Sequence, residues 1–322
     1  MTRRFSLKAL TGLALLVLAA AAVLFRPGAP RLADAEARAL YAAPLAPPQA
    51  GMRVFHLGHS LVGRDMPAML AQLAGAGHSY DSQLGWGTPL RAHWEPGVAI
   101  NGFDAENAHE RYRDATGALS SGEYDAFVAT EMVEIRDAIK YQNSAEYLAR
   151  WAGLARRGNP AVRIYLYETW PRIDDPEGWL ARLDKDLGRY WEDAILLRAI
   201  AADAARNPIY VIPAGQVFAR FVRAVEGLGG LDGMAGKQDL FAIGDDGARD
   251  PIHLNDLGTY LVALTHYAVL YQQSPVGLPY DLRRADGSPA VAPSAQLARL
   301  MQETVWQVVT RYPKTGVPQA GS

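Results

Sequence analysis

Short apolar runs alternate with stretches of helical periodicity along most of the chain. Five runs predict strands, at residues 54–57, 79–84, 124–130, 162–167 and 209–212. Apolar positions recur at the spacing of one helix face at 65–73, 145–157, 179–206, 216–225, 255–272 and 297–311. Short apolar strands that alternate with helices are typical of a parallel sheet covered on both faces. We therefore expect an α/β fold with its first strand near Val54.

The N-terminal pattern is different. Arg3, Arg4 and Lys8 precede an apolar run over residues 9–25. This order of charged and apolar regions is that of an export signal, and the run is nearly long enough to span a bilayer. We predict a signal peptide or signal anchor at residues 1–26. The protein is then exported, either periplasmic or membrane-anchored and facing the periplasm or outside, and cleavage of the signal stays open.

Three further segments complete the predicted organisation. Residues 27–51 are rich in Ala and Pro and predict a semi-extended spacer, with a short helix around residues 33–41. Residues 52–312 form the folded domain, within which residues 91–121 predict an irregular insertion that forms a wall of a pocket. Residues 313–322 predict a flexible, frayed tail.

Composition narrows the class of protein. The chain has 322 residues, of which 49% are hydrophobic, so it can bury one large core. Its net charge of −2 and the lack of a long basic run after the N-terminus speak against nucleic-acid binding. The chain has no cysteine, which excludes disulfides, thiolate catalysis and Cys-ligated zinc.

The first candidate for chemistry is Ser60, just past the carboxyl end of the first predicted strand. Open α/β sheets bind their ligands at that edge. Gly58 precedes Ser60 and can take the positive φ that a sharp exit from a strand often needs. On this stretch alone, Ser60 is either the cap of a turn or a nucleophile.

The second candidate is the segment from Asp250 to Asn255. An Asp three residues before a His can fold back so that its carboxylate accepts from imidazole Nδ1, which leaves Nε2 free as a base. Asn255 is a suitable N-cap for the following helix. A surface ion pair with a cap is the alternative, but a serine and an Asp-x-x-His at one sheet edge favour a serine hydrolase.

At these two segments the chain resembles the SGNH, or GDSL-like, hydrolase superfamily. FHLGHSL is similar to its first block, with Ser60 as nucleophile, and DPIHLNDLGTYLVA is similar to its last, with Asp250 and His253. The resemblance implies a three-layer α/β/α sandwich with a parallel, flavodoxin-like sheet. It also implies an oxyanion hole made by the serine N–H, a second-block glycine N–H and a third-block asparagine. Gly85 and Gly87 both suit the glycine, and Gly85 is preferred.

Two departures from the family affect the oxyanion site. His59 stands where the family has Asp, and Thr130-Glu131-Met132 replaces the third-block Gly-x-Asn-Asp. In one interpretation Glu131 turns away, and Thr130 or a backbone N–H donates. In the other, burial keeps Glu131 protonated and able to donate. We favour the first, because a hydroxyl donor needs no large pKa shift.

For the remaining candidate residues, a structural role is an alternative to a functional one. His56, His59 and Asp250 are one alternative, a metal site. However, His56 lies on a strand that we expect helices to cover, which favours a core residue. We therefore predict neither metal nor cofactor. Glu168, Trp170 and Arg172 leave the fourth strand at the expected pocket. Three more side chains with rings either stack on a sugar or are structural, namely Trp86, His93 and Trp94.

The expected activity is hydrolysis of a short acyl ester, such as an O-acetyl group, on a small molecule or carbohydrate. Membrane contact is expected only through the N-terminal segment. Two alternatives stay open. One is an envelope carbohydrate O-acyltransferase with the same triad, and the other is a binding or assembly protein that has lost turnover because of the altered third block.

Overall fold

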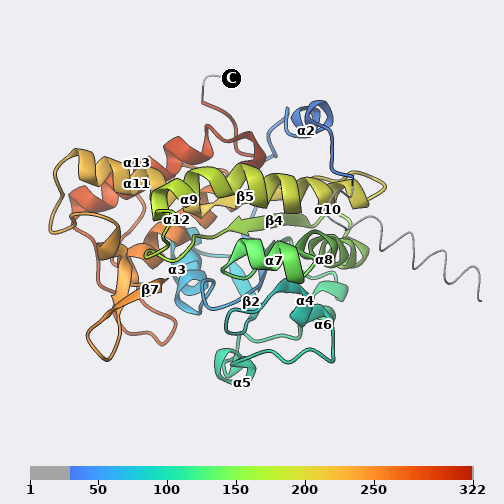
Figure 1. Cartoon of the computed structure of the whole chain (residues 1–322), viewed down its shortest axis with the longest axis horizontal. Coiled ribbons are helices and arrows are strands. Elements are labelled where there is room, and N and C mark those ends of the chain that lie inside the picture. Colours follow the sequence, from blue (N-terminus) through green and yellow to red (C-terminus); the bar gives the residue numbers. More distant parts are fainter. Residues whose placement is uncertain (1–29, 321–322) are drawn as a thin grey trace, which may run out of the picture.

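The computed structural model describes residues 30–320 and has a five-stranded sheet at its centre (Figure 1). The strands are β1 (Arg53–Leu57), β2 (Ser79–Gln83), β3 (Ala126–Ala129), β4 (Arg163–Glu168) and β5 (Tyr210–Pro213). Their order is β2-β1-β3-β4-β5, and all neighbouring pairs are parallel. The predicted flavodoxin-like α/β architecture is confirmed.

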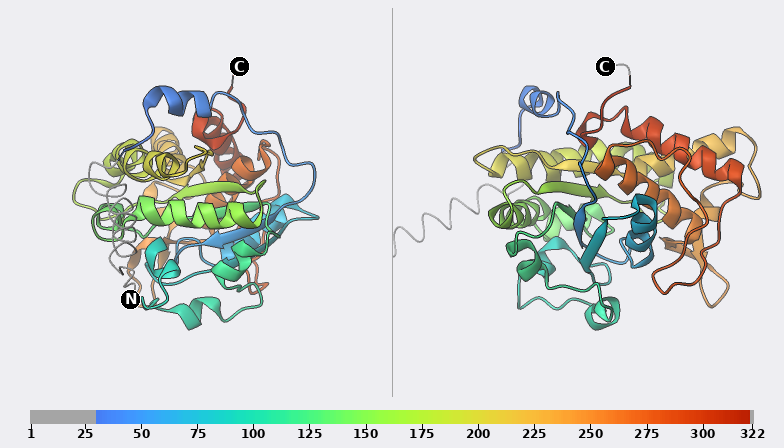
Figure 2. Two further views of the ribbon diagram at one scale, coloured as in Figure 1. Left: turned by 90° about the vertical axis from the view of Figure 1, so that its right-hand side faces the viewer. Right: turned by 180° about the vertical axis from the view of Figure 1, so that it is seen from behind.

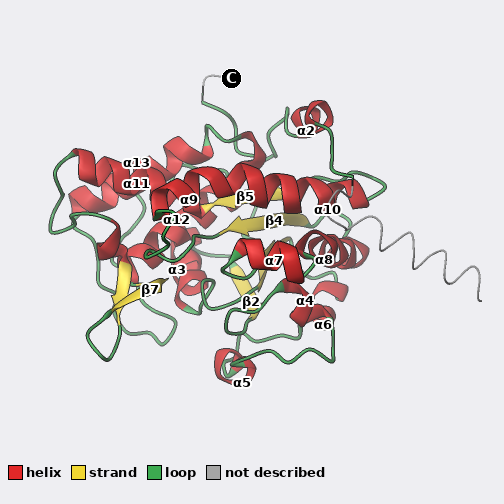
Figure 3. Ribbon diagram, viewed as in Figure 1, coloured by secondary structure: helices red, strands yellow, loops and turns green. Residues whose placement is uncertain are grey.

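Two groups of helices cover the sheet (Figure 3). The first group consists of α3 (Asp65–Ala74), α11 (Ala214–Gly227), α12 (Asp256–Tyr271) and α13 (Ala295–Val309). The second consists of α4 (Leu90–Trp94), α6 (Ala115–Ser120), α7 (Ile135–Tyr141), α8 (Ser144–Gly158), the π-helical η1 (Leu187–Leu196) and α10 (Leu197–Ala202). The helix α9 (Trp179–Asp186) contacts both α11 and η1 at the edge.

Helix α12 is the central element of the first layer. It packs on α3, α11, α13 and β5, and every residue from Tyr260 to Tyr271 is buried. A helix enclosed in this way has apolar residues all round, which matches its sequence. Seen from behind, α13 lies outermost beside it (Figure 2). The helix also follows directly on the segment that carries Asp250 and His253.

The N-terminal part of the described chain corrects the predicted spacer. The short helix expected around residues 33–41 is present as α2 (Asp34–Leu40). However, Leu32 and Tyr41 are buried, and the Tyr41 hydroxyl donates to the Ile209 carbonyl at 2.6 Å. The packed region therefore begins at Leu32 and not near Met52, because a few apolar residues of the segment pack against the domain. The predicted signal segment lies outside the described residues.

The predicted frayed tail is also wrong for its first part. The segment contains the 3₁₀ turn η3 (Pro313–Thr315), and Thr315 and Val317 are buried. The Gly316 carbonyl accepts from the Leu45 N–H at 2.8 Å. The C-terminal segment is thus bonded to the N-terminal segment at Leu45.

Several elements were not foreseen. Residues 91–121, expected to be irregular, carry most of α4 as well as α5 (Phe103–Asn107) and α6, and α7 was not predicted either. The Asp-x-x-His segment, expected as a loop, is the strand β7 (Arg249–Leu254), which pairs antiparallel with β6 (Phe241–Ile243). This hairpin stands at the side of the sheet (Figure 1). Asn255 caps α12 as predicted, since its side-chain oxygen accepts from the Gly258 N–H at 3.1 Å. Within residues 30–320, no helix has the length and apolar character needed to cross a membrane.

Candidate active site

Ser60 lies in the turn between β1 and α3. Gly58 allows this turn through its lack of a side chain, because a Cβ there would lie 2.6 Å from Thr130 Cγ2. Its φ is not positive, so the conformational role expected for Gly58 is wrong, and close approach is the reason for glycine. Ser60 emerges at the carboxyl edge of the sheet, next to the β3 loop.

The structure brings Ser60, His253 and Asp250 together. Ser60 Oγ lies 2.9 Å from His253 Nε2, and His253 Nδ1 lies 2.9 Å from Asp250 Oδ2. The other carboxylate oxygen of Asp250 accepts from the N–H groups of Ile252 and His253, each at 2.8 Å. This geometry fits a neutral imidazole that donates from Nδ1 and accepts the Ser60 hydroxyl at Nε2. The expected convergence is therefore present.

The charge on Asp250 is also favourable. Partial burial acts to raise the pKa of Asp250, but hydrogen bonds from the His253 and Ile252 N–H groups and the His253 ring hold it below its usual value. The carboxylate is therefore ionised at neutral pH. It fixes the imidazole tautomer and can stabilise an imidazolium.

The loop after β4 supports the segment that carries His253. Trp170 Nε1 donates to the Ile252 carbonyl at 2.9 Å, and the Ile173 N–H donates to the Pro251 carbonyl at 2.8 Å. Of the three residues predicted to line a pocket here, Arg172 lines the main cavity. Trp170 is almost fully buried and lies beside a smaller cavity of ≈ 130 Å³ that also contacts Ser60 and His253.

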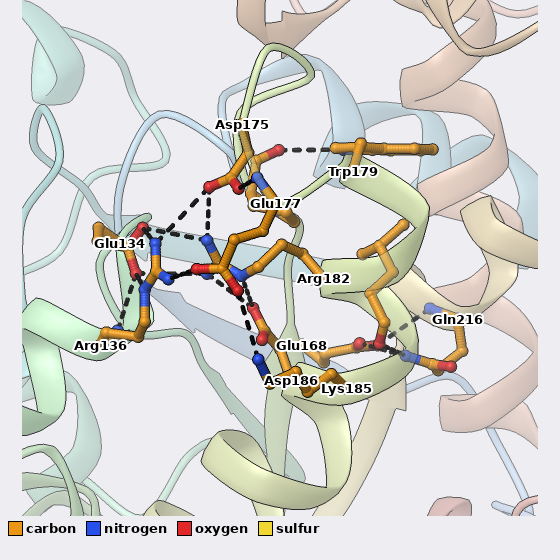
Figure 4. A network of polar contacts seen from close by, with 12 residues as sticks. Glu134, Arg136, Glu168, Asp175, Glu177, Trp179, Arg182, Lys185, Asp186 and Gln216 are labelled. Carbon is orange, nitrogen blue, oxygen red and sulfur yellow. Dashed lines mark hydrogen bonds and ion pairs between the residues drawn. The ribbon is translucent and has the colours of Figure 1, made fainter.

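Glu168 is the third of these residues, and its predicted pocket role is wrong. It is buried at the start of α11, where its carboxyl accepts from Gln216 Nε2 at 2.9 Å and from the Gln216 N–H at 3.2 Å (Figure 4). Burial raises the pKa of Glu168 to about 8. The side chain closes the helix N-terminus and does not line the cavity beside Ser60.

His59 and His93 are structural in this arrangement. His59 Nε2 donates to the Glu131 carbonyl at 2.8 Å, while its Nδ1 accepts from the Leu61 N–H. His93 Nε2 contacts the Gly58 carbonyl at 2.8 Å. Burial lowers the pKa of each ring to about 4, so both are neutral. They join the Ser60 turn to the β3 loop and to α4, and neither lines the cavity as a substrate contact would.

Thr130 does not serve as the predicted oxyanion donor. Its hydroxyl donates to the Tyr167 carbonyl at 2.8 Å, and the residue is fully buried. Strand β4 pairs with β3, so a β4 carbonyl lies within hydrogen-bond distance of the Thr130 hydroxyl at the end of β3. The preferred interpretation of Thr130 is therefore wrong.

Glu131 turns away from the cavity, as the favoured interpretation expected. Its Oε1 accepts from the Met132 N–H at 2.8 Å and from the Leu90 N–H at 3.3 Å. Burial raises the pKa of Glu131 to about 7, although the Met132 and Leu90 N–H groups act in the opposite direction. The carboxyl thus binds the loop backbone.

The preference for Gly85 over Gly87 is not supported. Gly85 is buried, and a Cβ there would lie 2.2 Å from Ile100 Cγ2 and 2.4 Å from Thr88 Oγ1. Gly87 has a φ of +56° and lines the cavity beside Ser60. Gly85 lets the loop pack, and Gly87 faces the site.

A cavity of ≈ 1290 Å³ opens from Ser60 and His253. The insertion forms one wall of it, as predicted, through Glu106, His109, Glu110 and Arg111. The insertion also positions Trp86, which is 55% exposed and whose Nε1 donates to Glu106 Oε1 at 2.8 Å. The cavity has further polar lining residues that no sequence motif indicated, namely Arg64, Asp65, Tyr80, Ser82, Arg284 and Asp286.

The conceivable metal site is not formed. His56 faces α12, where its ring lies 6.0 Å from that of His266, and it meets neither His59 nor Asp250. Burial lowers the pKa of His56 well below its ordinary value. Within residues 30–320, no cluster of three or more His, Asp or Glu side chains has the arrangement of a metal site.

Comparison with solved structures gives two distant matches. Neither a family model nor a curated protein matches the chain. A DUF4886 family protein from Bacteroides uniformis is 16% identical, with a TM-score of 0.49 over 82% of this chain and 96% of that one. A carbohydrate esterase family 2 enzyme with a carbohydrate binding domain, from Corynascus thermopiles (Myceliophthora fergusii), is 10% identical, with a TM-score of 0.30 over 53% of this chain and 59% of that one.

Proposed function

We propose that this chain is an SGNH-like serine esterase. The observation that carries the proposal is the continuous set of hydrogen bonds from Ser60 Oγ through His253 to Asp250. An ordinary surface ion pair would explain the His253–Asp250 contact alone, and a serine that caps a turn would not need a contact with His253. A hydroxyl, a base and an orienting carboxylate in line, at the edge of a large cavity, are the parts of an acyl-transfer site.

The proposed reaction has two steps. Ser60 Oγ attacks the ester carbonyl carbon while its proton passes to His253 Nε2, and the alcohol leaves with that proton. Water then attacks the acyl-serine carbonyl and gives a proton to His253. Ser60 regains the proton, and the acyl group leaves as a carboxylic acid. Asp250 stays ionised and stabilises the imidazolium in both steps.

The cavities support a short acyl group on a polar alcohol. The smaller cavity of ≈ 130 Å³ beside Ser60 and His253 has room only for a short chain. The larger one is lined by arginines, carboxylates and the exposed Trp86, beside the aliphatic Pro67, Val133, Ile252 and Ala285. Such a lining suits a carbohydrate, whose hydroxyls bond to charged groups and whose ring stacks on an aromatic face. We therefore propose an O-acetyl or similar ester on a carbohydrate.

We also propose that the protein is exported. Arg3, Arg4 and Lys8 before the apolar run support this part of the proposal. Fractionation of a C-terminally tagged full-length protein tests it. The tagged protein is expected in the periplasm or the membrane fraction, and recovery of the full-length form as a soluble cytoplasmic protein contradicts export.

Hydrolysis of p-nitrophenyl acetate by the purified protein tests the esterase proposal. Wild type is expected to release p-nitrophenol, and Ser60→Ala to lose at least about 10³-fold in kcat. Ser121→Ala, which removes a hydroxyl at the end of α6, is the matched control and should keep full activity. A folded wild type without activity contradicts the proposal and favours a binding protein. Transfer of acetyl to an added oligosaccharide instead of water identifies a transferase.

A further inference from the structure

Neither of the two side chains at the place of the family's asparagine, Thr130 and Glu131, can stand in for it. The Thr130 hydroxyl is already bonded to the Tyr167 carbonyl, and the Glu131 carboxyl is buried against the Met132 and Leu90 N–H groups. Neither group reaches the cavity that Ser60 and His253 share. A third donor to an oxyanion must therefore come from elsewhere in the β3 loop or from another loop.

The main chain offers such donors. Ser60, Gly87 and Val133 all line the cavity next to His253. In the part of the chain that the structure describes, the N–H groups of these three residues have no hydrogen-bond partner. Unpaired N–H groups at the wall of a site are the usual components of an oxyanion hole.

The β3 loop holds Val133 between two fixed points. On one side, the His59 ring donates to the Glu131 carbonyl, and the Glu131 carboxyl accepts from the Met132 N–H at 2.8 Å. On the other, the Glu134 carboxylate caps α7 by accepting from the Arg136 N–H at 3.0 Å. The Met132 N–H is therefore already hydrogen-bonded. The neighbouring Val133 N–H stays available to a ligand in the cavity.

We propose that the Val133 N–H replaces the missing asparagine as the third donor, beside the N–H groups of Ser60 and Gly87. Glu131 is then a positioning residue that fixes the loop through Met132. The proposal rests on the esterase function. A neutral main-chain donor held by a buried side chain needs no reorganisation when charge develops, which is the physical requirement for this role.

Removal of a single N–H tests the donor directly. Incorporation of α-hydroxyisovaleric acid at position 133 turns the amide into an ester and keeps the valine side chain. With p-nitrophenyl acetate, kcat is expected to fall by about 10- to 10²-fold with KM nearly unchanged. The matched control is the same replacement at Val276, whose N–H donates to Ser274 Oγ at 3.3 Å on an exposed loop. That control should keep wild-type kcat.

The positioning role of Glu131 is tested by a pair of variants. Glu131→Gln keeps a side-chain acceptor for the Met132 N–H and should keep kcat within about tenfold of wild type. Glu131→Ala removes the acceptor and should lower kcat further, again with little change in KM. Equal kcat values for the two variants, both with folded thermal transitions, would show that the carboxyl has no positioning role.

The outcomes separate this proposal from the esterase proposal. Covalent labelling of Ser60 by an alkyl fluorophosphonate, read by mass spectrometry, reports the activated serine in every variant. If Ser60 is labelled and the position 133 ester keeps wild-type kcat, the Val133 inference is overturned while the esterase function stands. If wild type neither turns over the acetate nor becomes labelled, the esterase proposal fails and this inference fails with it.

Discussion

Trp170 Nε1 donates a 2.9 Å hydrogen bond to the carbonyl of Ile252, the residue directly before His253. The indole is almost fully buried and meets Phe218 edge to face, with ring centroids 4.8 Å apart. The bond ties the imidazole-bearing strand β7 to the β4 loop. In the described part of the chain, β7 belongs to a two-stranded sheet with the short β6, so this support is expected to fix the orientation of His253.

Trp170→Phe tests this relationship. The variant keeps an aromatic ring but loses the donor, so kcat for p-nitrophenyl acetate should fall by about tenfold with KM little changed, because a small displacement of the base weakens proton transfer. Trp306→Phe on α13, a partly buried tryptophan packed against the core, is the control. Equal losses in the two variants would mean that general packing, and not the bond to Ile252, is responsible.

The β4 loop is itself held by buried charge. Arg182 is 1% exposed and forms ion pairs with Asp175 at 2.6 Å and Asp186 at 2.7 Å (Figure 4). Arg182→Met removes the partner of buried Asp186 and the nearer partner of Asp175, which keeps only Arg136 at 3.7 Å, so the free energy of unfolding should fall by about 3–5 kcal/mol. Urea denaturation measures this change.

An exposed ion pair provides the comparison. Arg223 pairs with Asp184, and both side chains are exposed, at 43% and 52%. Arg223→Met should lower the free energy of unfolding by no more than about 1 kcal/mol. A similar cost for Arg182→Met and Arg223→Met would show that the buried network contributes little.

Stability should fall in mild acid. Burial lowers the pKa of four buried histidines, to about 4 for His59, His93 and His266 and well below the ordinary value for His56. As pH falls, these histidines are protonated in the unfolded chain before they are protonated in the folded protein. Their contribution to the free energy of unfolding is therefore complete above pH ~6.5 and is lost as pH falls toward 4. Each such histidine contributes a slope of about 1.4 kcal/mol per pH unit in that window.

Two buried carboxyls oppose this trend. The pKa is raised to about 7 for Glu131 and to about 8 for Glu168, so protonation favours the folded state as pH falls toward 4.5, from about 7 for Glu131 and from about 8 for Glu168. Four histidines outweigh two carboxyls, and urea midpoints should be lower at pH 5 than at pH 7. His56→Leu removes a ring with no hydrogen-bond partner in the described chain and should flatten the slope. An unchanged midpoint between these pH values contradicts the expectation.

Thr130→Val separates structure from catalysis at the end of β3. The variant keeps the methyl group beside Gly58 and loses only the hydroxyl that donates to Tyr167. It should lower the free energy of unfolding by about 1 kcal/mol and leave kcat near wild type. A kcat loss of roughly tenfold or more would restore Thr130 as an oxyanion donor.

The sequence was sufficient where the pattern is local or follows a general rule. Asp250 and His253 are three residues apart, and the rule that ligands bind at the carboxyl ends of parallel strands places them near Ser60. It was not sufficient where long-range packing decides. The burial of Leu32 and Tyr41, the Thr130 hydroxyl that bonds β4, and the choice of Gly87 over Gly85 depend on elements that no local pattern reveals.

Labelling of Ser60 is the measurement that tests the central claim most directly. An alkyl fluorophosphonate reacts with a serine only when a base activates it, so the adduct reports the Ser60–His253 pair without knowledge of the natural substrate. Peptide mass spectrometry should find one adduct, on the peptide that contains Ser60, and no adduct in Ser60→Ala. His253→Gln should slow labelling strongly. A folded wild-type protein that stays unlabelled, or that is labelled at another residue, would contradict the account.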